Sequence, residues 1–340
     1  MSHGKSIIVG THYAYIYVGT PPQRQSVIID TGSHYTAFPC VGCAGCGQHT
    51  DNYFDISKSS TSIPCTGNSC SLSQSYAEGS SWRAQKVTDK IWIGGENIGD
   101  VPIGDLYNIS YQFGCQTSES GLFTSQLEDG IMGMSMSADS LQNQLLNTHR
   151  TTTNMFGLCF RVGGGVMTLG GIDESMHTDP STLRFAQLKN AGGLSGWYGV
   201  TVINIQFRTK SSPEVESRLV DIALASTVAN AMNKGVGTII DSGTTETYLP
   251  STLFSAFKSA FHEITGVNYI PDTDISLTAA QLALMPDLVF TFQPASSSAA
   301  NIEVTMPFHS YSEKDADKFS FQIYLDEPSS FVLGANFMDG

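Results

Sequence analysis

The sequence has few basic residues and no long apolar run, and each of these absences excludes a class of protein. It contains 17 Lys and Arg among 340 residues, against 31 Asp and Glu, so its net charge is -14. Because the cations are dispersed along the chain, we expect no nucleic-acid partner. No apolar run reaches the ~18–20 residues that a membrane-spanning helix needs. The segment 1–5 also lacks the pattern of a signal peptide.

Long helical patterns are also scarce, whereas short strand-like runs alternate with turns. The best helical patterns cover residues 140–146 and 250–264. Strand patterns cover residues 13–18, 26–29, 90–93, 166–169 and 197–207. Together with the length, this distribution predicts a mostly β protein of about two domains.

An internal repeat is the most informative feature of the sequence. The segment 27–33, Val-Ile-Ile-Asp-Thr-Gly-Ser, recurs at 238–244 as Thr-Ile-Ile-Asp-Ser-Gly-Thr. The first copy is followed by Asp-Gly-Ile-Met-Gly at 129–133, and the second by Phe-Val-Leu-Gly at 331–334. A repeat with such a long period indicates two duplicated lobes rather than a solenoid.

Each copy of the repeat carries an aspartate, Asp30 or Asp241, at the end of an apolar run. The glycine two residues later allows a sharp turn that brings backbone N–H groups to the carboxylate. Two carboxylates ~3 Å apart cannot both ionise, so such a pair shares one proton. The ionised member can take a proton from a water, while the protonated member donates to a scissile carbonyl oxygen. This chemistry needs no metal or other cofactor.

These motifs resemble those of the pepsin-like aspartic protease family over nearly the whole chain. The segments 19–23, Gly-Thr-Pro-Pro-Gln, and 169–173, Leu-Gly-Gly-Ile-Asp, match as well. The resemblance implies two β-rich lobes, residues 1–180 and 181–340, with a central active-site cleft. It implies an aspartic endopeptidase acting on polypeptides, or alternatively an inactive inhibitor or peptide-binding protein on the same fold. The residues expected to support the catalytic pair are Thr31, Gly32, Ser33, Ser242, Gly243 and Thr244.

The resemblance also identifies residues 72–84 as the flap, a hairpin that closes over the substrate in this family. The run Ser-Tyr-Ala-Glu-Gly-Ser at 75–80 places Tyr76 at the flap tip, beside Gly79. Family members often carry a tryptophan that partners this tyrosine, but this chain has Ala37 at that place. Trp82, just beyond the flap tip, is a candidate replacement.

Glu78 is a candidate residue for recognising substrate charge, because it lies two residues after the flap tyrosine. Arg83 is the nearest basic residue in sequence. A charge-assisted hydrogen bond to a substrate Arg or Lys would be worth roughly 1.5–3 kcal/mol, about a ten- to hundredfold preference. Some members of the family that this chain resembles cut their substrates near an Arg, which favours this role for Glu78. The alternative is a Glu78 that points to water and steadies the turn.

A cysteine-rich segment follows the first aspartate. Cys40, Cys43, Cys46 and His49 are equally spaced, a pattern compatible with zinc, with an iron–sulfur loop or with disulfides. The nepenthesin-like and plasmepsin V-like branch of the family carries an insertion here, at about residues 40–70, so the resemblance favours disulfides and no metal. The disulfide candidates are Cys40, Cys43, Cys46, Cys65, Cys70, Cys115 and Cys159, an odd number that leaves at least one unpaired.

The cysteines and one glycosylation sequon, at Asn108, favour the secretory pathway, whether secreted, ER/Golgi or vacuolar. We therefore expect a targeting signal outside this sequence. The family usually continues beyond the second Leu-Gly motif, so a missing C-terminal segment could carry an eighth cysteine and a membrane anchor. We expect a monomer whose partner is its polypeptide substrate. The hydroxyl of Thr244 goes with an acidic optimum in this family, between about pH 3.5 and 6.

Overall fold

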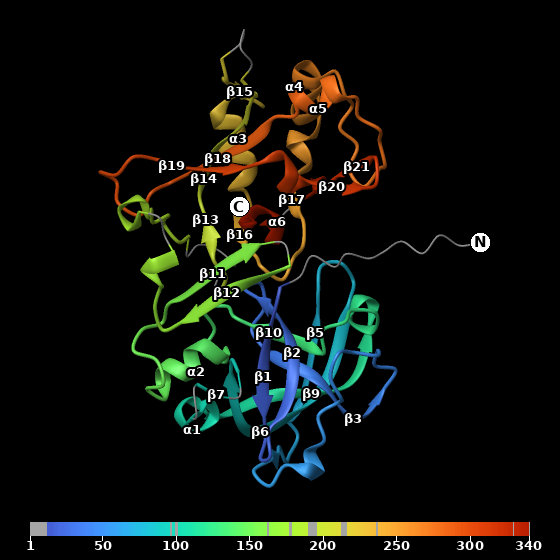
Figure 1. Cartoon of the computed structure of the whole chain (residues 1–340), viewed down its shortest axis with the longest axis vertical. Coiled ribbons are helices and arrows are strands. Elements are labelled where there is room, and N and C mark those ends of the chain that lie inside the picture. The colour runs from blue at the N-terminus through green and yellow to red at the C-terminus, as the bar shows by residue number, and fades with distance from the viewer. Residues whose placement is uncertain are drawn as a thin grey trace, which may run out of the picture. The chain divides into compact units, whose positions relative to one another are not determined.

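The computed structural model describes residues 12–95, 97–98, 101–161, 163–176, 179–189, 196–211, 216–235, 237–328 and 330–339. The chain divides into two compact units (Figure 1). The first comprises residues 1–158 and 166–173, and the second comprises residues 159–165 and 174–340. Strands predominate, as the scarcity of helical patterns predicted.

The first unit is built around an eight-stranded sheet. Its strands are β1 (Tyr13–Val18), β2 (Gln23–Asp30), β3 (Thr36–Ala44), β4 (Ile63–Pro64), β5 (Ser71–Ser75), β6 (Ser81–Ile93), β9 (Ile109–Ser120) and β10 (Gly130–Gly133). Their order is β1-β2-β10-β3-β9-β6-β4, and β5 pairs with β6. Strand β1 pairs with both β2 and β6, which closes the sheet into a barrel. The smaller elements are β7 (Asn97–Ile98), β8 (Val101–Pro102), α1 (Ile103–Tyr107), α2 (Leu141–Asn147), η1 (Ile56–Lys58) and η2 (Gly121–Thr124).

Two apolar clusters form on opposite faces of this sheet, because successive side chains of a strand point to opposite sides. The larger contains Phe38 and Phe113, whose rings stack 4.7 Å apart. The smaller consists of Ile28, Ala37, Trp82, Ala84, Phe123 and Ile131, with Tyr76 packed against it. This smaller cluster supports the expected flap.

The second unit contains a five-stranded sheet, β13-β16-β23-β17-β22, and a four-stranded sheet, β15-β14-β18-β19. Its strands are β13 (Gly199–Val200), β14 (Val202–Arg208), β15 (Leu219–Asp221), β16 (Gly237–Ile240), β17 (Thr247–Pro250), β18 (Asp287–Phe292), β19 (Ile302–Met306), β20 (Ser312–Asp315), β21 (Lys318–Phe321), β22 (Ile323–Glu327) and β23 (Ser330–Leu333). Its helices are α3 (Ala225–Met232), α4 (Phe254–Thr265), α5 (Ala279–Leu284) and α6 (Ala335–Met338), with the 3-10 turns η3 (Glu174–Met176), η4 (Pro180–Thr182), η5 (Ser251–Leu253) and η6 (Phe308–Tyr311). Its core packs aromatic rings, among them Tyr269 stacked on Phe321 at 4.6 Å.

Most expected elements are present, with two corrections. The prediction of a single strand over 197–207 is wrong. The segment forms two strands, β13, which pairs with β16, and β14, which pairs with β18. The helix predicted from residue 250 begins as the 3-10 turn η5 and continues as α4. The hairpin β11 (Phe156–Arg161) and β12 (Gly164–Leu169) lies where the chain passes between the two units.

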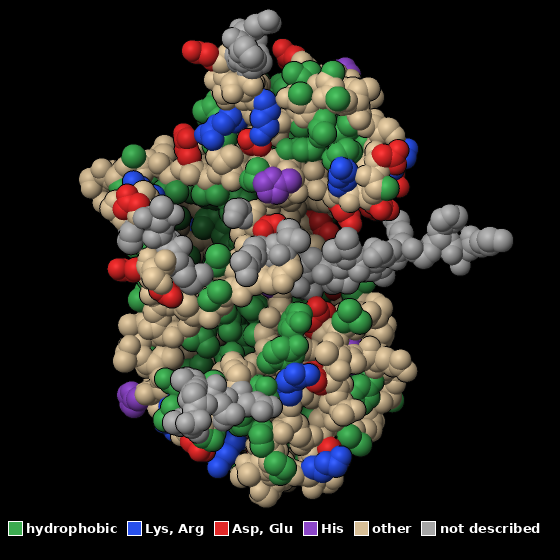
Figure 2. All heavy atoms as spheres, viewed as in Figure 1, with side chains coloured by type: hydrophobic (Ala, Val, Ile, Leu, Met, Phe, Trp, Pro, Cys, Tyr) green, Lys and Arg blue, Asp and Glu red, His purple; other side chains and the backbone are tan. Residues whose placement is uncertain are grey.

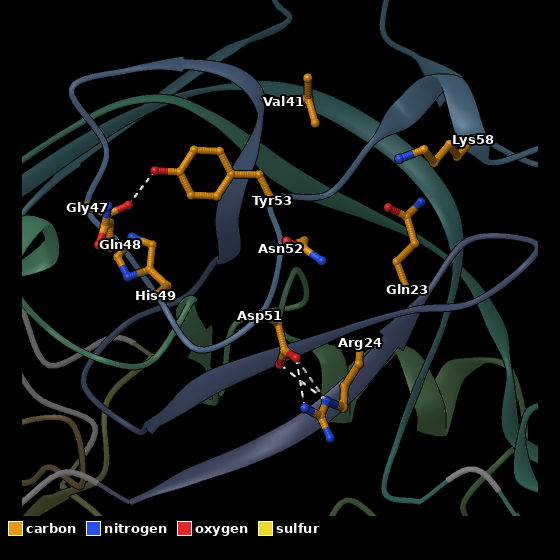
Figure 3. A pocket seen from close by; sticks show the side chains of 10 residues that line it. All are labelled: Gln23, Arg24, Val41, Gly47, Gln48, His49, Asp51, Asn52, Tyr53 and Lys58. Carbon is orange, nitrogen blue, oxygen red and sulfur yellow. Dashed lines mark hydrogen bonds and ion pairs between the residues drawn. The ribbon is translucent and has the colours of Figure 1, made fainter.

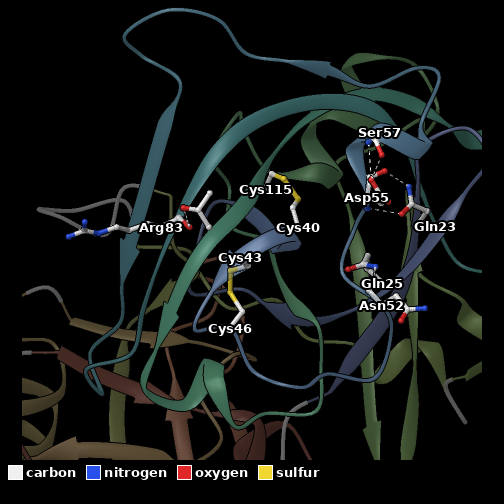
Figure 4. Close-up of a disulfide and its surroundings, with 11 residues drawn as sticks. Gln23, Gln25, Cys40, Cys43, Cys46, Asn52, Asp55, Ser57, Arg83 and Cys115 are labelled. Atoms are coloured by element: carbon white, nitrogen blue, oxygen red, sulfur yellow. Dashed lines mark hydrogen bonds between the residues drawn. A yellow bond between two sulfur atoms is a disulfide. The ribbon is translucent and has the colours of Figure 1, made fainter.

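Six of the seven cysteines form three disulfides in the first unit. The bonds are Cys40–Cys115, Cys43–Cys46 and Cys65–Cys70. Figure 4 shows the first two, of which Cys40–Cys115 joins β3 to β9 across 75 residues. Cys159, expected as a disulfide candidate, is instead a free, exposed thiol. The equally spaced cysteines that also suggested zinc are therefore bonded in disulfides.

The surface mixes charges of both signs. On the face shown in Figure 2, Lys and Arg side chains are scattered and form no single patch. Within the described ranges, no helix is both long and apolar enough to cross a bilayer.

Candidate active site

The first aspartate loop begins at the end of β2, which runs parallel to β10. Asp30 is 3% exposed and lies opposite Gly133. The Gly32 N–H donates to Asp30 Oδ1 at 2.8 Å, and the Met134 N–H donates to the Asp30 carbonyl oxygen at 2.7 Å. A side chain at Gly133 would collide with the backbone of His34. The chain therefore needs glycine in β10 to hold the buried carboxylate in this loop.

The second aspartate loop repeats this geometry at the end of β16, which runs parallel to β23. The Gly243 N–H donates to Asp241 Oδ1 at 2.9 Å, and the Thr244 hydroxyl donates to Asp241 Oδ2 at 2.7 Å. The Asp241 N–H donates to the Leu333 carbonyl oxygen at 3.0 Å. A side chain at Gly334 would collide with the carbonyl oxygens of Glu246 and Thr244. The downstream glycine thus has the same task in both units.

The other supporting residues lie within these loops. Thr31, Ser33 and Ser242 follow their aspartates within three residues and are buried away from solvent. The Ser33 carbonyl oxygen accepts from the Ser135 N–H at 3.1 Å, tying the first loop to the chain after β10.

The expected flap is the hairpin of β5 and β6, joined by the turn at 76–80. The Tyr76 N–H donates to the Ser80 carbonyl oxygen at 2.9 Å, and Gly79 has φ +96°, a conformation that glycine adopts without strain. The pKa of Tyr76 is raised, first by burial and then by the charge of Asp30. The flap tyrosine is therefore a neighbour of the first aspartate within one unit.

Two further side chains hold the flap tyrosine. The indole N–H of Trp82, which is 1% exposed, donates to the Tyr76 hydroxyl at 3.2 Å. Trp82 shares its apolar cluster with Ala37, so it takes the partner role considered for it in the sequence. The ring of Phe123 packs 5.2 Å from that of Tyr76. No motif pointed to Phe123, because its contact depends on tertiary structure alone.

A model of the eukaryotic aspartyl protease family matches residues 11–340 of this chain. The chain belongs to that family. The match covers both aspartate loops and the expected flap.

Three relatives indicate where this chain lies within the family. It is 34% identical to aspartic protease 5 of Toxoplasma gondii over 212 residues, which cover 51% of this chain and 21% of the relative. It is 29% identical to plasmepsin V of Plasmodium falciparum over 184 residues, 47% of this chain and 30% of the relative. Embryonic pepsinogen of Gallus gallus is 26% identical over 337 residues, 96% of this chain and 75% of the relative. The chain thus spans under a third of the first two relatives and resembles their cysteine-rich branch.

A separate surface pocket of about 890 Å³ lies beside the cysteine-rich segment of this aspartyl protease (Figure 3). Two cations line it, but Arg24 is paired with Asp51 at 2.8 Å and Lys58 with Asp55 at 3.1 Å. Because these charges are already neutralised, the pocket offers no free charge to a ligand. Among the described residues, no group of His, Cys, Asp and Glu is arranged to hold a metal ion.

Replacing Trp82 with Phe should weaken catalysis without unfolding the protease. The substitution keeps most of the buried ring but removes the hydrogen bond to Tyr76, worth about 0.5–1.5 kcal/mol, or about two- to twelvefold in kcat/KM. The matched control is Trp92→Phe, whose indole N–H donates to the Gly95 carbonyl oxygen at 3.2 Å. Steady-state peptide hydrolysis checks both; equal losses in the two variants would contradict a role for Trp82 in the flap.

Proposed function

We propose that this aspartyl protease is an active endopeptidase that hydrolyses polypeptides, with Asp30 and Asp241 as its catalytic pair. One observation carries the proposal: each aspartate lies at the end of a strand, Asp30 as the last residue of β2 and Asp241 directly after β16, and accepts the N–H of the glycine two residues later, at 2.8 and 2.9 Å. Two copies of one carboxylate-holding loop fit a mechanism that uses two carboxylates in complementary protonation states.

In the proposed mechanism, the pair holds one proton and a water is activated between the two carboxylates. The ionised carboxylate takes a proton from the water, and the protonated one donates to the scissile carbonyl oxygen as negative charge develops there. Tyr76, held by Trp82, covers the Asp30 side and helps to exclude bulk water.

The test is hydrolysis of a peptide library by the purified chain, read by mass spectrometry, with and without pepstatin. We expect cleavage between about pH 3.5 and 6 that pepstatin abolishes. A folded protein that cleaves no peptide would support the alternative of an inactive inhibitor or binding protein. Cleavage that resists pepstatin would contradict the aspartate pair.

We also propose that the protein works in the secretory pathway as a monomer. Its three disulfides support an oxidising compartment. Its proposed partner is the polypeptide substrate.

Glu78 is proposed to favour substrates with Arg or Lys before the cut. It lies in the flap turn two residues after Tyr76, and its charge acts on that tyrosine. Because Glu78 is exposed, water screens the pair, so we expect only about a two- to fivefold preference rather than the larger one that a dry site would give.

Glu78→Gln should therefore lower the ratio of kcat/KM for an Arg peptide to that for a norleucine peptide by about two- to fivefold. Asp105→Asn, which removes an exposed carboxylate from α1, is the matched control and should leave the ratio unchanged. An unchanged ratio in Glu78→Gln would show that Glu78 does not read substrate charge.

A further inference from the structure

A buried ion pair joins the cysteine-rich segment to the end of β9. His49 Nε2 lies 3.3 Å from Glu119 Oε2, and both side chains are 0% exposed. His49 follows the loop closed by the Cys43–Cys46 disulfide, and the Gly47 N–H donates to Glu119 Oε2 at 3.2 Å. Neither residue belongs to the aspartate loops, and the proposed reaction does not use them.

The hydrogen-bond pattern determines the protonation of this pair. His49 Nδ1 lies 3.1 Å from the Gln126 carbonyl oxygen, which can only accept, so Nδ1 carries a proton. His49 Nε2 faces a carboxylate oxygen, so a second proton must lie between Nε2 and Glu119. If that proton is lost, two acceptors face each other at 3.3 Å without solvent to separate them.

The charges around the pair favour keeping that proton. Burial lowers the pKa of His49, but the hydrogen bond and charge of Glu119, the Gln126 carbonyl and the charge of Asp129 outweigh burial, so the pKa is raised. Asp51 lies close to Asp129, and its own charge is paired with Arg24 at 2.8 Å.

Among the described residues, a tyrosine also lies beside this pair. The ring of Tyr53 lies 6.1 Å from that of His49, and its hydroxyl donates to the Gly47 carbonyl oxygen. Among the described residues, His49 is the only cationic side chain that forms an ion pair with Glu119. The imidazolium is therefore the group that neutralises this buried carboxylate.

The segment that the pair anchors also supports the flap. It runs from Glu119 to Gln126, and each of these two residues bonds His49. Between them, the Leu122 N–H donates to Ser80 Oγ at 2.9 Å, and Phe123 packs against Tyr76. The loss of the Nε2 proton of His49 would thus release the Glu119 end of the segment that carries Phe123, while Nδ1 still donates to the Gln126 carbonyl oxygen.

We propose that the protonated His49–Glu119 pair is a positioning device for the flap, which orders Tyr76 while it holds its proton and releases it when the proton leaves. Its effect on catalysis rests on the proposed function; its effect on flap order does not.

The direction of the pH dependence follows from linkage. A raised His49 pKa in the folded protein means that the stabilisation is complete below the ordinary value of about 6.5 and is lost as the pH rises through the folded value. Flap order should therefore fall above neutral pH, on the alkaline side of the expected activity range.

Hydrogen exchange of the flap, residues 71–85, and of residues 119–126 tests this, measured by mass spectrometry from about pH 5.5 to 8.5 and corrected for intrinsic rates. In the unaltered protein, protection should fall about tenfold for each unit by which the His49 pKa is raised. The inactive variant Asp241→Asn should show the same step. Absence of the step in the unaltered protein would overturn the proposal.

Glu119→Gln should remove the step, because its amide oxygen can still accept from the Gly47 N–H but carries no charge to keep the second proton on His49 Nε2. His49→Gln, which offers an N–H to Glu119 at every pH, should remove it too and serves if the first variant folds poorly. Glu303→Gln, at the exposed pair with Arg208, is the matched carboxylate-to-amide control and should keep the step. A step that persists in Glu119→Gln would contradict the proposal. If the unaltered protein shows the pH step in hydrogen exchange but cleaves no peptide, the proposed function alone is refuted.

Discussion

Asp30→Asn and Asp241→Asn should each reduce kcat for peptide hydrolysis by about a thousandfold or more. Asparagine keeps the shape of the side chain and can still accept the N–H of Gly32 or Gly243 through its carbonyl oxygen. It cannot take or give the proton that the pair shares, so general acid and general base catalysis are lost together. Steady-state kinetics with a cleaved library peptide measures the loss.

Two controls separate this loss from unfolding. Urea denaturation should give each variant a free energy of unfolding at least as large as that of the unaltered protein at neutral pH, because a buried carboxylate has become neutral. Asp221→Asn, in the exposed edge strand β15, should keep full activity. If either aspartate variant retains near-normal kcat, the assignment of the catalytic pair is wrong.

Gly133→Ala and Gly334→Ala should each destabilise the unit that carries it by about 1–3 kcal/mol, since the added methyl has no space. At Gly133 it would meet the backbone of His34, and at Gly334 it would meet the carbonyl oxygens of Glu246 and Thr244. Relief requires the aspartate loop to shift, and a shift of ~1 Å can cost about a hundredfold in rate. Activity should therefore fall further than the loss of stability alone explains.

The control for this pair is Gly171→Ala, because a Cβ at Gly171 would meet nothing within 4 Å. Urea denaturation gives the free energy of unfolding, and kcat/KM at a temperature where every variant is folded gives the catalytic loss. Normal stability and activity in Gly133→Ala and Gly334→Ala would mean that these close approaches do not hold the aspartate loops.

The sequence alone predicted the mostly β fold, the duplication and the candidate aspartates. These features are local: an apolar run, an acid and a turn-forming glycine lie next to one another in the chain, and the repeat at 238–244 shows the pattern twice. The flap hairpin is local too, because its strands are joined by the five-residue turn 76–80. The helices α3 and α5 were not predicted, because their segments are short; α3 buries only Val228 and Met232, and α5 buries no residue.

Only the tertiary structure decided which distant residues meet. The cysteine spacing allowed metal or disulfides until Cys40 was found bonded to Cys115, 75 residues away. The indole of Trp82 reaches Tyr76 because β6 brings it to the cluster where Ala37 leaves room. His49 and Glu119 become a pair because the cysteine-rich loop folds onto the end of β9. Such contacts depend on strand order and on burial, which remove water from between the groups, and neither is encoded in the spacing of residues along the chain.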